Sequence, residues 1–443
     1  MSAAGPIRGS APVPSRAETV VVGAGLAGLA CSRRLTEQGV GVLLLETADA
    51  AGGRVRTDRV DGFRCDRGFQ LLNPSYPEAR RVLDLPSLRL QPLPAGLVVA
   101  SAGGRRLLTD PRRTPPRSWP AALVGALAGG ELSEKLAFAR WALRAAIADP
   151  ANLLAEPDEP WGAALSGRGI DGRLRREVVE PFLAGTLGER DGVSSRRFVE
   201  LLVRSFVRGT PAVPWSGMQA LPDQLAAALP EGTVRLGVPV VDVTADRVHT
   251  ADGTINAETV VVATDPRSAA RLTGLPEPRM RGLTTFWHVA EQAPTRSGAL
   301  HIDADRRGPV TNTVVMSNSA PSYSPDRRAL IATTVLGGGG DGDGAQLEAA
   351  VRTQLQTVYG ADTRGWELLT VHAIPHALTA MNPPLDPRHP VELDDGLLVA
   401  GDHRDTASIQ GALVSGRRAA DAVLRRLGRA VPPRARVGAG RGR

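Results

Sequence analysis

Lysine, cysteine and long apolar runs are scarce in this chain of 443 residues. The two cysteines, Cys31 and Cys65, are far apart in sequence, which excludes a disulfide framework and offers no metal-ligand spacing, so we expect no bound metal. A reducing cytoplasm is the simplest setting for such a chain. No apolar run approaches the roughly 20 residues of a transmembrane helix, so we expect no membrane span.

Arginine supplies almost all of the positive charge, because Lys135 is the only lysine. The formal net charge of +7 would suit nucleic acid, but the arginines are scattered among acidic residues, so we expect no nucleic-acid partner. The exception is the tail 428–443, rich in Arg, Gly and Pro, which we expect to be basic and flexible. The alternative to a tail that is simply solvated is peripheral contact of its arginines with an anionic membrane. Residues 1–16 lack the apolar segment of a secretory signal and are expected to form a flexible lead.

A glycine-rich turn organises the N-terminal part of the chain. The β-branched run before the turn predicts a buried strand, and the segment after it predicts a helix. Gly23 permits the tight turn, Gly25 lets backbone approach a pyrophosphate, and Gly28 lets the helix pack closely on the strand. Leu26 and Ala27 complete the turn, which therefore predicts a dinucleotide site at the helix N-terminus.

A second buried strand, residues 41–46, ends at Glu46, about 20 residues after the turn, where a carboxylate holds a ribose 2′-hydroxyl. The loop that follows contains Gly52, Gly53 and Arg54. The two glycines supply permissive backbone, and the guanidinium can pair bidentately with a pyrophosphate. A surface loop with no ligand is the alternative for this segment.

The C-terminal part repeats the order of strand, glycine and helix. A buried strand, residues 397–400, delivers Gly401 and Asp402 at its carboxyl end, where open α/β sheets bind ligands. The segment 410–427 predicts a helix, and Ser408 is placed to cap it. A plain turn followed by a capped helix is the alternative.

Residues 23–70 and 396–420 together resemble the flavin amine oxidase, protoporphyrinogen oxidase and phytoene desaturase superfamily. The first stretch runs G-A-G-L-A-G through L-L-L-E and G-G-R-V-R-T to D-G-F-R-C-D-R-G-F-Q, and the second contains V-A-G-D and S-I-Q-G-A-L-V-S-G-R-R-A-A. Two separated motifs in the expected order are more specific than either alone. Segments 180–188 and 213–222 are most similar to the phytoene-desaturase-like members.

The resemblance implies non-covalent FAD as the cofactor. It also implies an α/β Rossmann-type FAD-binding domain, glutathione-reductase-like, with a mixed α+β substrate domain inserted discontinuously. The FAD domain would comprise residues 17–92, 230–268 and 391–427, and the substrate domain 93–229 and 269–390. Asp402 would accept hydrogen bonds from ribityl hydroxyls, and the C-terminal helix would face the flavin pyrimidine edge. The further cofactor contacts that it implies are from Gln70, Leu71, Val240, Ala263, Gly401, Ile409, Gln410, Gly411 and Ala412.

The substrate intervals differ in pattern. The first has apolar residues at helical spacing, and the second alternates β-branched runs with turns, which predicts an antiparallel sheet flooring the substrate cavity. Between them, a strand and then a hairpin with an Asp252-Gly253 turn are expected. The predicted helices are 132–147 and 196–207, and the predicted strands are 234–242, 283–289, 298–302, 310–317, 329–336 and 367–372.

Two departures from the family pattern bear on the reaction. Many amine oxidases have a lysine on a substrate-domain strand and an aromatic residue before the C-terminal helix, whereas this chain has neither at those places. Both absences favour dehydrogenation of a hydrophobic small molecule, with hydride passing to flavin N5, and either oxygen or a quinone as electron acceptor. The alternatives are an amine-oxidase-like or protoporphyrinogen-oxidase-like flavin oxidase, a redox-neutral isomerase, and a binding protein like the Rab GDP-dissociation inhibitors, without FAD.

The catalytic residues are not identified by the sequence. His288 is the candidate general base, on a strand that is expected to face the cavity, and a structurally bonded histidine is the alternative. His372 and His376 lack the helical spacing of a metal pair. His403 follows Asp402 directly and is expected either near the flavin or in a capping role.

Overall fold

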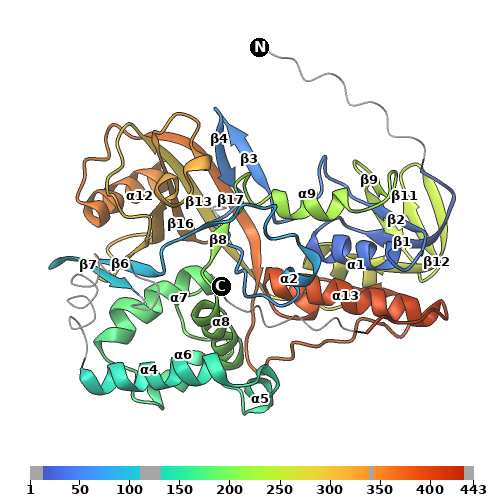
Figure 1. Ribbon diagram of the computed structural model, residues 1–443, viewed down its shortest axis with the longest axis horizontal. Helices are drawn as coiled ribbons and strands as arrows, with labels where there is room; N and C mark the ends of the chain where they lie inside the picture. Colours follow the sequence, from blue (N-terminus) through green and yellow to red (C-terminus); the bar gives the residue numbers. More distant parts are fainter. Residues whose placement is uncertain (1–12, 110–130, 339–343, 434–443) are drawn as a thin grey trace.

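The computed structural model describes residues 13–109, 131–338 and 344–433. Two seven-stranded sheets organise these residues, with the first sheet at the right of Figure 1 and the second at the upper left. The first sheet has the strand order β10-β11-β12-β1-β2-β9, and β18 also pairs with β12. Its strands are β1 (Arg16–Val22), β2 (Val42–Leu45), β9 (Val234–Arg235), β10 (Val240–Val243), β11 (Arg247–Thr250), β12 (Gly253–Val262) and β18 (Leu398–Val399).

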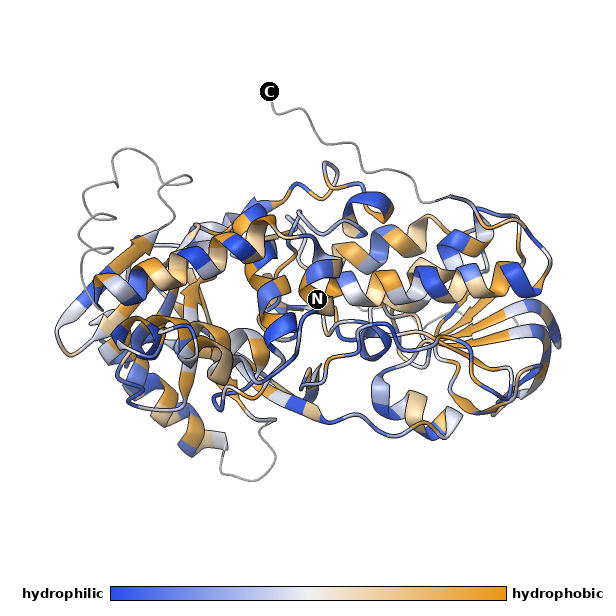
Figure 2. Cartoon of the chain, turned by 90° about the horizontal axis from the view of Figure 1, so that it is seen from below, coloured by the Kyte–Doolittle hydropathy of each residue, from blue (hydrophilic) through white to orange (hydrophobic). Residues whose placement is uncertain are grey.

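The middle of the first sheet is parallel. Strand β1 lies between β2 and β12, and β18 extends the parallel part beyond β12. The paired parts of these strands, Val20–Val22, Leu43–Leu45, Val260–Val262 and Leu398–Val399, are buried and apolar, as expected for a sheet covered on both faces. They form the orange ends of the strands at the right of Figure 2. Three segments far apart in sequence therefore build one sheet.

Helices α1 (Leu26–Thr36) and α13 (Ile409–Arg426) lie side by side against this sheet (Figure 1). Small residues permit the close approach, because a Cβ added at Gly416 would lie 2.1 Å from the carbonyl oxygen of Ala27. The first and last helices of the nucleotide fold are thus packed directly together. Helix α9 (Ala220–Ala227) also packs on α1, although the predicted domain boundary at residue 230 placed it with the substrate domain.

The antiparallel end of the first sheet differs from the prediction. The expected strand 234–242 is two strands, β9 beside β2 and β10 beside β11. Gly237, at φ +70°, breaks the extended backbone between them. The predicted hairpin is confirmed, but Thr250 pairs with Gly253, so Ala251 and Asp252 form the turn and Gly253 already begins β12. This second strand continues without a break into the parallel part of the sheet.

The second sheet has the order β17-β13-β16-β15-β14-β6-β7 and is antiparallel except where β14 pairs with β6. The five strands expected from the sequence are present, and β6 and β7 extend the sheet from a segment that was not predicted as strand. Its strands are β6 (Gly96–Ser101), β7 (Gly104–Thr109), β13 (Met280–Ala290), β14 (Leu300–Asp303), β15 (Val310–Val315), β16 (Ala329–Leu336) and β17 (Glu367–Thr379).

Helices cover both faces of the second sheet. Helix α12 (Gly344–Tyr359) packs on one face through a cluster that includes Phe286, Ile331 and Trp366. Helix α7 (Glu180–Leu187) packs on β15, where Gly185 lies against Asn312. The other strands and α-helices are β3 (Thr57–Val60), β4 (Phe63–Asp66), α2 (Ala79–Val82), β5 (Gln91–Pro92), α4 (Leu132–Ile147), α5 (Pro150–Ala155), α6 (Trp161–Ser166), α8 (Arg196–Arg208), β8 (Ala212–Val213), α10 (Pro266–Thr273) and α11 (Met316–Ser319). Among the described residues, three short helices of other types are η2 (Arg175–Val179), η3 (Pro321–Tyr323) and η4 (Asp402–Arg404).

The two ends of the chain are more ordered than the sequence suggested. Residues 13–16 lead into β1, and the carbonyl oxygen of Ser15 accepts from the amide of Asn256. Arg429 forms an ion pair with Glu18, and Arg34 donates to the carbonyl oxygen of Pro432 at 3.1 Å. The rest of the predicted lead and tail, 1–12 and 434–443, lies outside the described residues. Within the described ranges, no helix combines the length and apolar character that crossing a bilayer requires.

Candidate functional site

The glycine-rich turn has the geometry that a pyrophosphate requires. Gly23 adopts φ +103°, and a Cβ on it would lie 2.8 Å from the carbonyl oxygen of Ala263. At Gly28 a Cβ would lie 1.9 Å from the carbonyl oxygen of Gly23. At Gly25, which begins α1 without a side-chain cap, a Cβ would meet nothing within 4 Å. Two glycines are thus needed for packing, whereas Gly25 borders open space at the helix N-terminus, where anions bind.

Glu46 is held beside this turn at the carboxyl end of β2. Its carboxylate accepts hydrogen bonds from the amides of Ala24 at 2.7 Å and Ala48 at 2.9 Å, and the residue is 9% exposed. The carboxylate is therefore held between the loop that follows β1 and the loop that follows β2. Its contact with a ribose stays a prediction.

The loop after β2 folds back onto the turn. The amide of Gly52 donates to the carbonyl oxygen of Ala24 at 2.8 Å, and Gly52 pairs with Gly25 as an isolated bridge. Gly52 and Gly53 adopt φ +131° and +58°, which favour glycine. A Cβ on Gly53 would lie 3.3 Å from the Cα of Gly25. The two glycine motifs therefore form one surface.

Arg54 connects the N-terminal and C-terminal motifs. Its guanidinium forms an ion pair with Asp402, which is 5% exposed, and donates to the carbonyl oxygen of Ala377 at 3.0 Å. Burial acts to lower the pKa of Arg54, but the charge and hydrogen bond of Asp402 outweigh it and raise that pKa. The structure thus brings together two motifs that the sequence separates by 348 positions.

The C-terminal motif is fixed by hydrogen bonds around the start of α13. Ser408 caps the helix by accepting from the amide of Gly411 at 3.0 Å, and the amide of Gly401 donates to Ser415 at 2.9 Å. Gln410 accepts from the amide of Glu78 at 2.9 Å, which ties α13 to the segment before α2. Ile409 and Ala412 complete this first turn, so the amides of α13 begin next to Asp402.

Two side chains in this region have buried polar atoms without a partner. The Oε1 atom of Gln70 accepts no hydrogen bond, although its Nε2 donates to the carbonyl oxygen of Arg54 at 2.6 Å. Both ring nitrogens of His403 are unbonded, and burial lowers its pKa to about 4. Buried polar atoms are normally satisfied, so the region has hydrogen-bonding capacity to spare for a ligand. Leu71, next to Gln70, is partly buried.

Two further predicted nucleotide contacts, Ala263 and Val240, lie on or next to strands of the first sheet. Ala263 directly follows β12, lies beside Gly23 and is 4% exposed. Val240 lies on β10, which is separated from β12 by β11. Its contact with adenine stays a prediction.

The prediction that His288 faces the cavity is wrong. His288 is fully buried and bonds Glu348 of α12 through Nε2 at 3.0 Å, and burial lowers its pKa. Its neighbour Trp287 points the opposite way and donates to the carbonyl oxygen of Asp66 at 3.3 Å. Because side chains alternate along a strand, the two cannot share a face. His288 is a structural residue beneath α12.

The two histidines that the sequence analysis excluded as a metal pair, His372 and His376, have protein partners. His372 contacts the carbonyl oxygen of Asp66 through Nδ1 at 3.2 Å and Asp58 through Nε2 at 3.0 Å. His376 lies 2.7 Å from Arg267. In the portion of the chain that the structure covers, no group of three or more His, Cys, Asp or Glu side chains is arranged to hold a metal.

Comparison with known proteins gives the family. The chain matches the family described as flavin containing amine oxidoreductase over residues 26–424, and it belongs to that family. Its members are FAD-dependent oxidoreductases, and FAD is therefore the cofactor of this chain. The alternative of a binding protein without FAD is set aside.

Relatives vary in the extent of the match. AofH of Mycobacterium tuberculosis is 48% identical over 62 residues, only 14% of each chain. Coproporphyrinogen III oxidase of Propionibacterium freudenreichii is 27% identical over 72% of each chain. Polyamine oxidase 1 of Oryza sativa is 29% identical over 54% of this chain and 50% of its own. The matched part of the relative is therefore 14% of AofH, 50% of polyamine oxidase 1 and 72% of coproporphyrinogen III oxidase.

Solved structures share the fold. Putrescine oxidase bound to putrescine superposes with a TM-score of 0.69 at 18% identity, covering 93% of this chain and 99% of that one. Cyclohexylamine oxidase from Brevibacterium oxydans gives 0.64 at 18% identity, covering 94% and 100%. These likenesses support a Rossmann-like FAD-binding domain joined to a substrate domain.

The described residues fit FAD. Gly25 leaves space at the α1 N-terminus, Arg54 supplies a positive charge, and Gln70 and His403 have unbonded polar atoms. When bound, FAD supplies a hydride acceptor at its isoalloxazine ring. The protein's part is to bind and orient the cofactor and to place a substrate beside it.

Proposed function

We propose that this FAD-dependent oxidoreductase dehydrogenates a hydrophobic small molecule in the manner of a desaturase. One observation carries the proposal: a neutral patch of the second sheet faces segment 66–70, which is next to the predicted flavin contacts. Thr285 and Trp287 of β13 lie opposite Thr334 and Ala332 of β16 on this face. The hydrogen bond from Trp287 to the carbonyl oxygen of Asp66 fixes the orientation of the face.

Burial shifts the pKa values of two ionisable groups beside this patch toward their neutral forms. Burial lowers the pKa of His372, which pairs in register with Thr285. Burial raises the pKa of Asp66 to about 6, although Thr57, Met218 and Tyr323 all donate hydrogen bonds to its carboxylate. The Asp66 carboxylate is already occupied by these three donors, so it offers a cationic amine little stabilisation, whereas an uncharged C–H bond needs none.

The sequence departures support the same substrate class. Lys135 lies on α4 in the helical part of the molecule and not on the second sheet (Figure 1). Asp405, Thr406, Ala407 and Ser408 precede α13 without an aromatic residue. A porphyrinogen-oxidase-like reaction is the second candidate, because coproporphyrinogen III oxidase aligns over most of both chains. We also propose oxygen or a quinone as electron acceptor and keep peripheral membrane contact and cytoplasmic location as proposals.

Anaerobic reduction of the bound flavin tests this function. The holoprotein is mixed with a carotenoid precursor in detergent micelles, with coproporphyrinogen III, or with putrescine, and flavin absorbance is followed. We expect the uncharged polyene to bleach the flavin at least about tenfold faster than putrescine, because the neutral patch stabilises no ammonium group. Dithionite bleaching of each sample controls for competent flavin. Faster bleaching by putrescine would overturn the proposal.

A further inference from the structure

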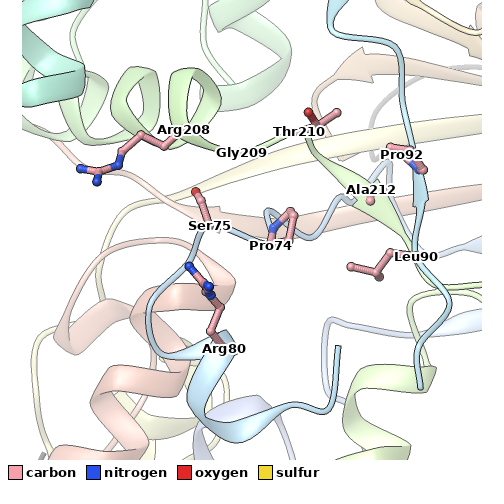
Figure 3. A pocket seen from close by; sticks show the side chains of 9 residues that line it. All are labelled: Pro74, Ser75, Arg80, Leu90, Pro92, Arg208, Gly209, Thr210 and Ala212. Carbon is pink, nitrogen blue, oxygen red and sulfur yellow. The ribbon is translucent and has the colours of Figure 1, made fainter. Parts of the chain in front are cut away.

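A hollow of about 440 Å³ lies where α2 and the end of α8 meet the β5 and β8 pair. Its walls differ in chemistry (Figure 3). Arg80, Ser75 and Arg208 line one side, and Leu90 and Ala212 are on the other. The volume is that of a small organic ligand. Neither the cofactor motifs nor the neutral patch includes these residues.

The positive charge of this pocket is not neutralised. Among the described residues, Arg80 and Arg208 form no ion pair with a carboxylate, and no acidic residue lines the pocket. Neighbouring arginines behave differently, since Arg81 pairs with Glu78 at 3.1 Å and Arg204 donates to the carbonyl oxygen of Ala146 at 2.6 Å. Both arginines are exposed, and Figure 3 shows the Arg80 guanidinium beside Ser75, whereas the Arg208 side chain extends away from Leu90. Neither is committed to a carboxylate of the described chain, so both can serve an external anion.

Hydrogen bonds hold the pocket in shape without a ligand. Asn73, 3% exposed, donates to the carbonyl oxygen of Ser205 in α8 at 2.8 Å and accepts from the amide of Ser75 at 2.9 Å. Leu72 and Ala212 exchange two backbone hydrogen bonds of 2.9 Å. A Cβ on Gly209 would lie 2.1 Å from the Oδ1 of Asn73, so glycine is needed there. The two walls are therefore joined in a fixed relation.

We infer that this pocket binds an organic carboxylate with an apolar body. The Arg80 guanidinium pairs with the carboxylate, since arginine matches carboxylate geometry with two parallel hydrogen bonds. The exposed Arg208 side chain turns toward the ligand and adds the second positive charge. The side formed by Leu90 and Ala212 covers the apolar body. An inorganic anion uses only one side of the pocket and binds more weakly. This site goes beyond the proposed function and does not depend on the flavin reaction.

The test measures binding of 2-naphthoate to the holoprotein by calorimetry, with inorganic phosphate and 2-naphthylmethanol as comparison probes. We expect naphthoate to bind more tightly than either. The double variant Arg80→Gln, Arg208→Gln should weaken naphthoate binding at least about tenfold, because two charge-assisted pairs are lost. Flavin content should remain unchanged, which separates this result from any failure of the FAD assignment.

The matched control is the double variant Arg59→Gln, Arg425→Gln. Both residues are exposed and lie outside the pocket. Their substitution removes the same total charge as the substitution of Arg80 and Arg208. We expect this control to bind naphthoate as the unmodified chain does. The inference is overturned if naphthoate does not bind, if both double variants weaken it equally, or if phosphate or the alcohol binds equally well.

Discussion

The substitution Gly25→Val should remove FAD while leaving the chain folded. A Cβ at residue 25 meets no atom within 4 Å in this structure, so the folded protein accommodates the new side chain. The same space borders the first amides of α1, where the pyrophosphate is expected, and the valine would occupy it. We expect the Kd for FAD to rise at least about 100-fold, equivalent to about 2.7 kcal/mol. Flavin absorbance after desalting measures the effect, and circular dichroism with thermal unfolding monitors the fold.

Two other glycines provide controls. Gly365→Val places the same side chain on an exposed turn, where a Cβ also meets nothing within 4 Å, and it should retain FAD. Gly28→Val should unfold the protein, because its Cβ would lie 1.9 Å from the carbonyl oxygen of Gly23. Normal flavin content in a folded Gly25→Val protein would show that the pyrophosphate does not pass this turn.

FAD should bind more tightly as the pH falls, through protonation of His403. The charged groups that act on its ring are Asp402, Arg404, Arg54 and Asp265, and burial lowers its pKa to about 4. A pyrophosphate beside the ring stabilises the imidazolium, so the pKa is higher with FAD bound than without it. Affinity therefore increases as the pH falls below the bound-state pKa, until the free protein is also protonated near pH 4.

The magnitude follows from uptake of one proton. The Kd for FAD should decrease by up to about tenfold per pH unit within that window. The His403→Gln side chain keeps a hydrogen-bond donor but does not titrate. The dependence of the FAD Kd on pH should therefore be less steep in this variant. Asp405, whose pKa burial raises to about 6, is present in both proteins and cancels in the comparison. Fluorescence titration with FAD between pH 5 and 8 measures the slopes, and equal slopes would exclude His403 from the cofactor's anionic part.

The elements with the strongest sequence pattern were predicted closely. Helix α4 and strand β16 have the predicted bounds, because apolar periodicity decides them locally. The turn at Gly23 and the start of α13 were also predicted, since each motif specifies its own backbone. The ion pair of Arg54 with Asp402 was not, because no local pattern encodes a contact between such distant positions.

The error at His288 has a physical origin. Alternation along β13 shows that Trp287 and His288 face opposite sides, but it does not show which side α12 covers. That choice depends on tertiary packing between Phe286, Trp366 and α12. The pocket at Arg80 and Arg208 was missed for a similar reason, since three separate segments form it.

The central claim is that the two distant motifs form one FAD site, and the absorbance spectrum of the purified chain tests it most directly. We expect a flavin spectrum and about one FAD released per chain on denaturation. If the protein is colourless as purified, incubation with FAD followed by desalting should restore the spectrum. A folded chain that remains colourless after that treatment would contradict the assignment.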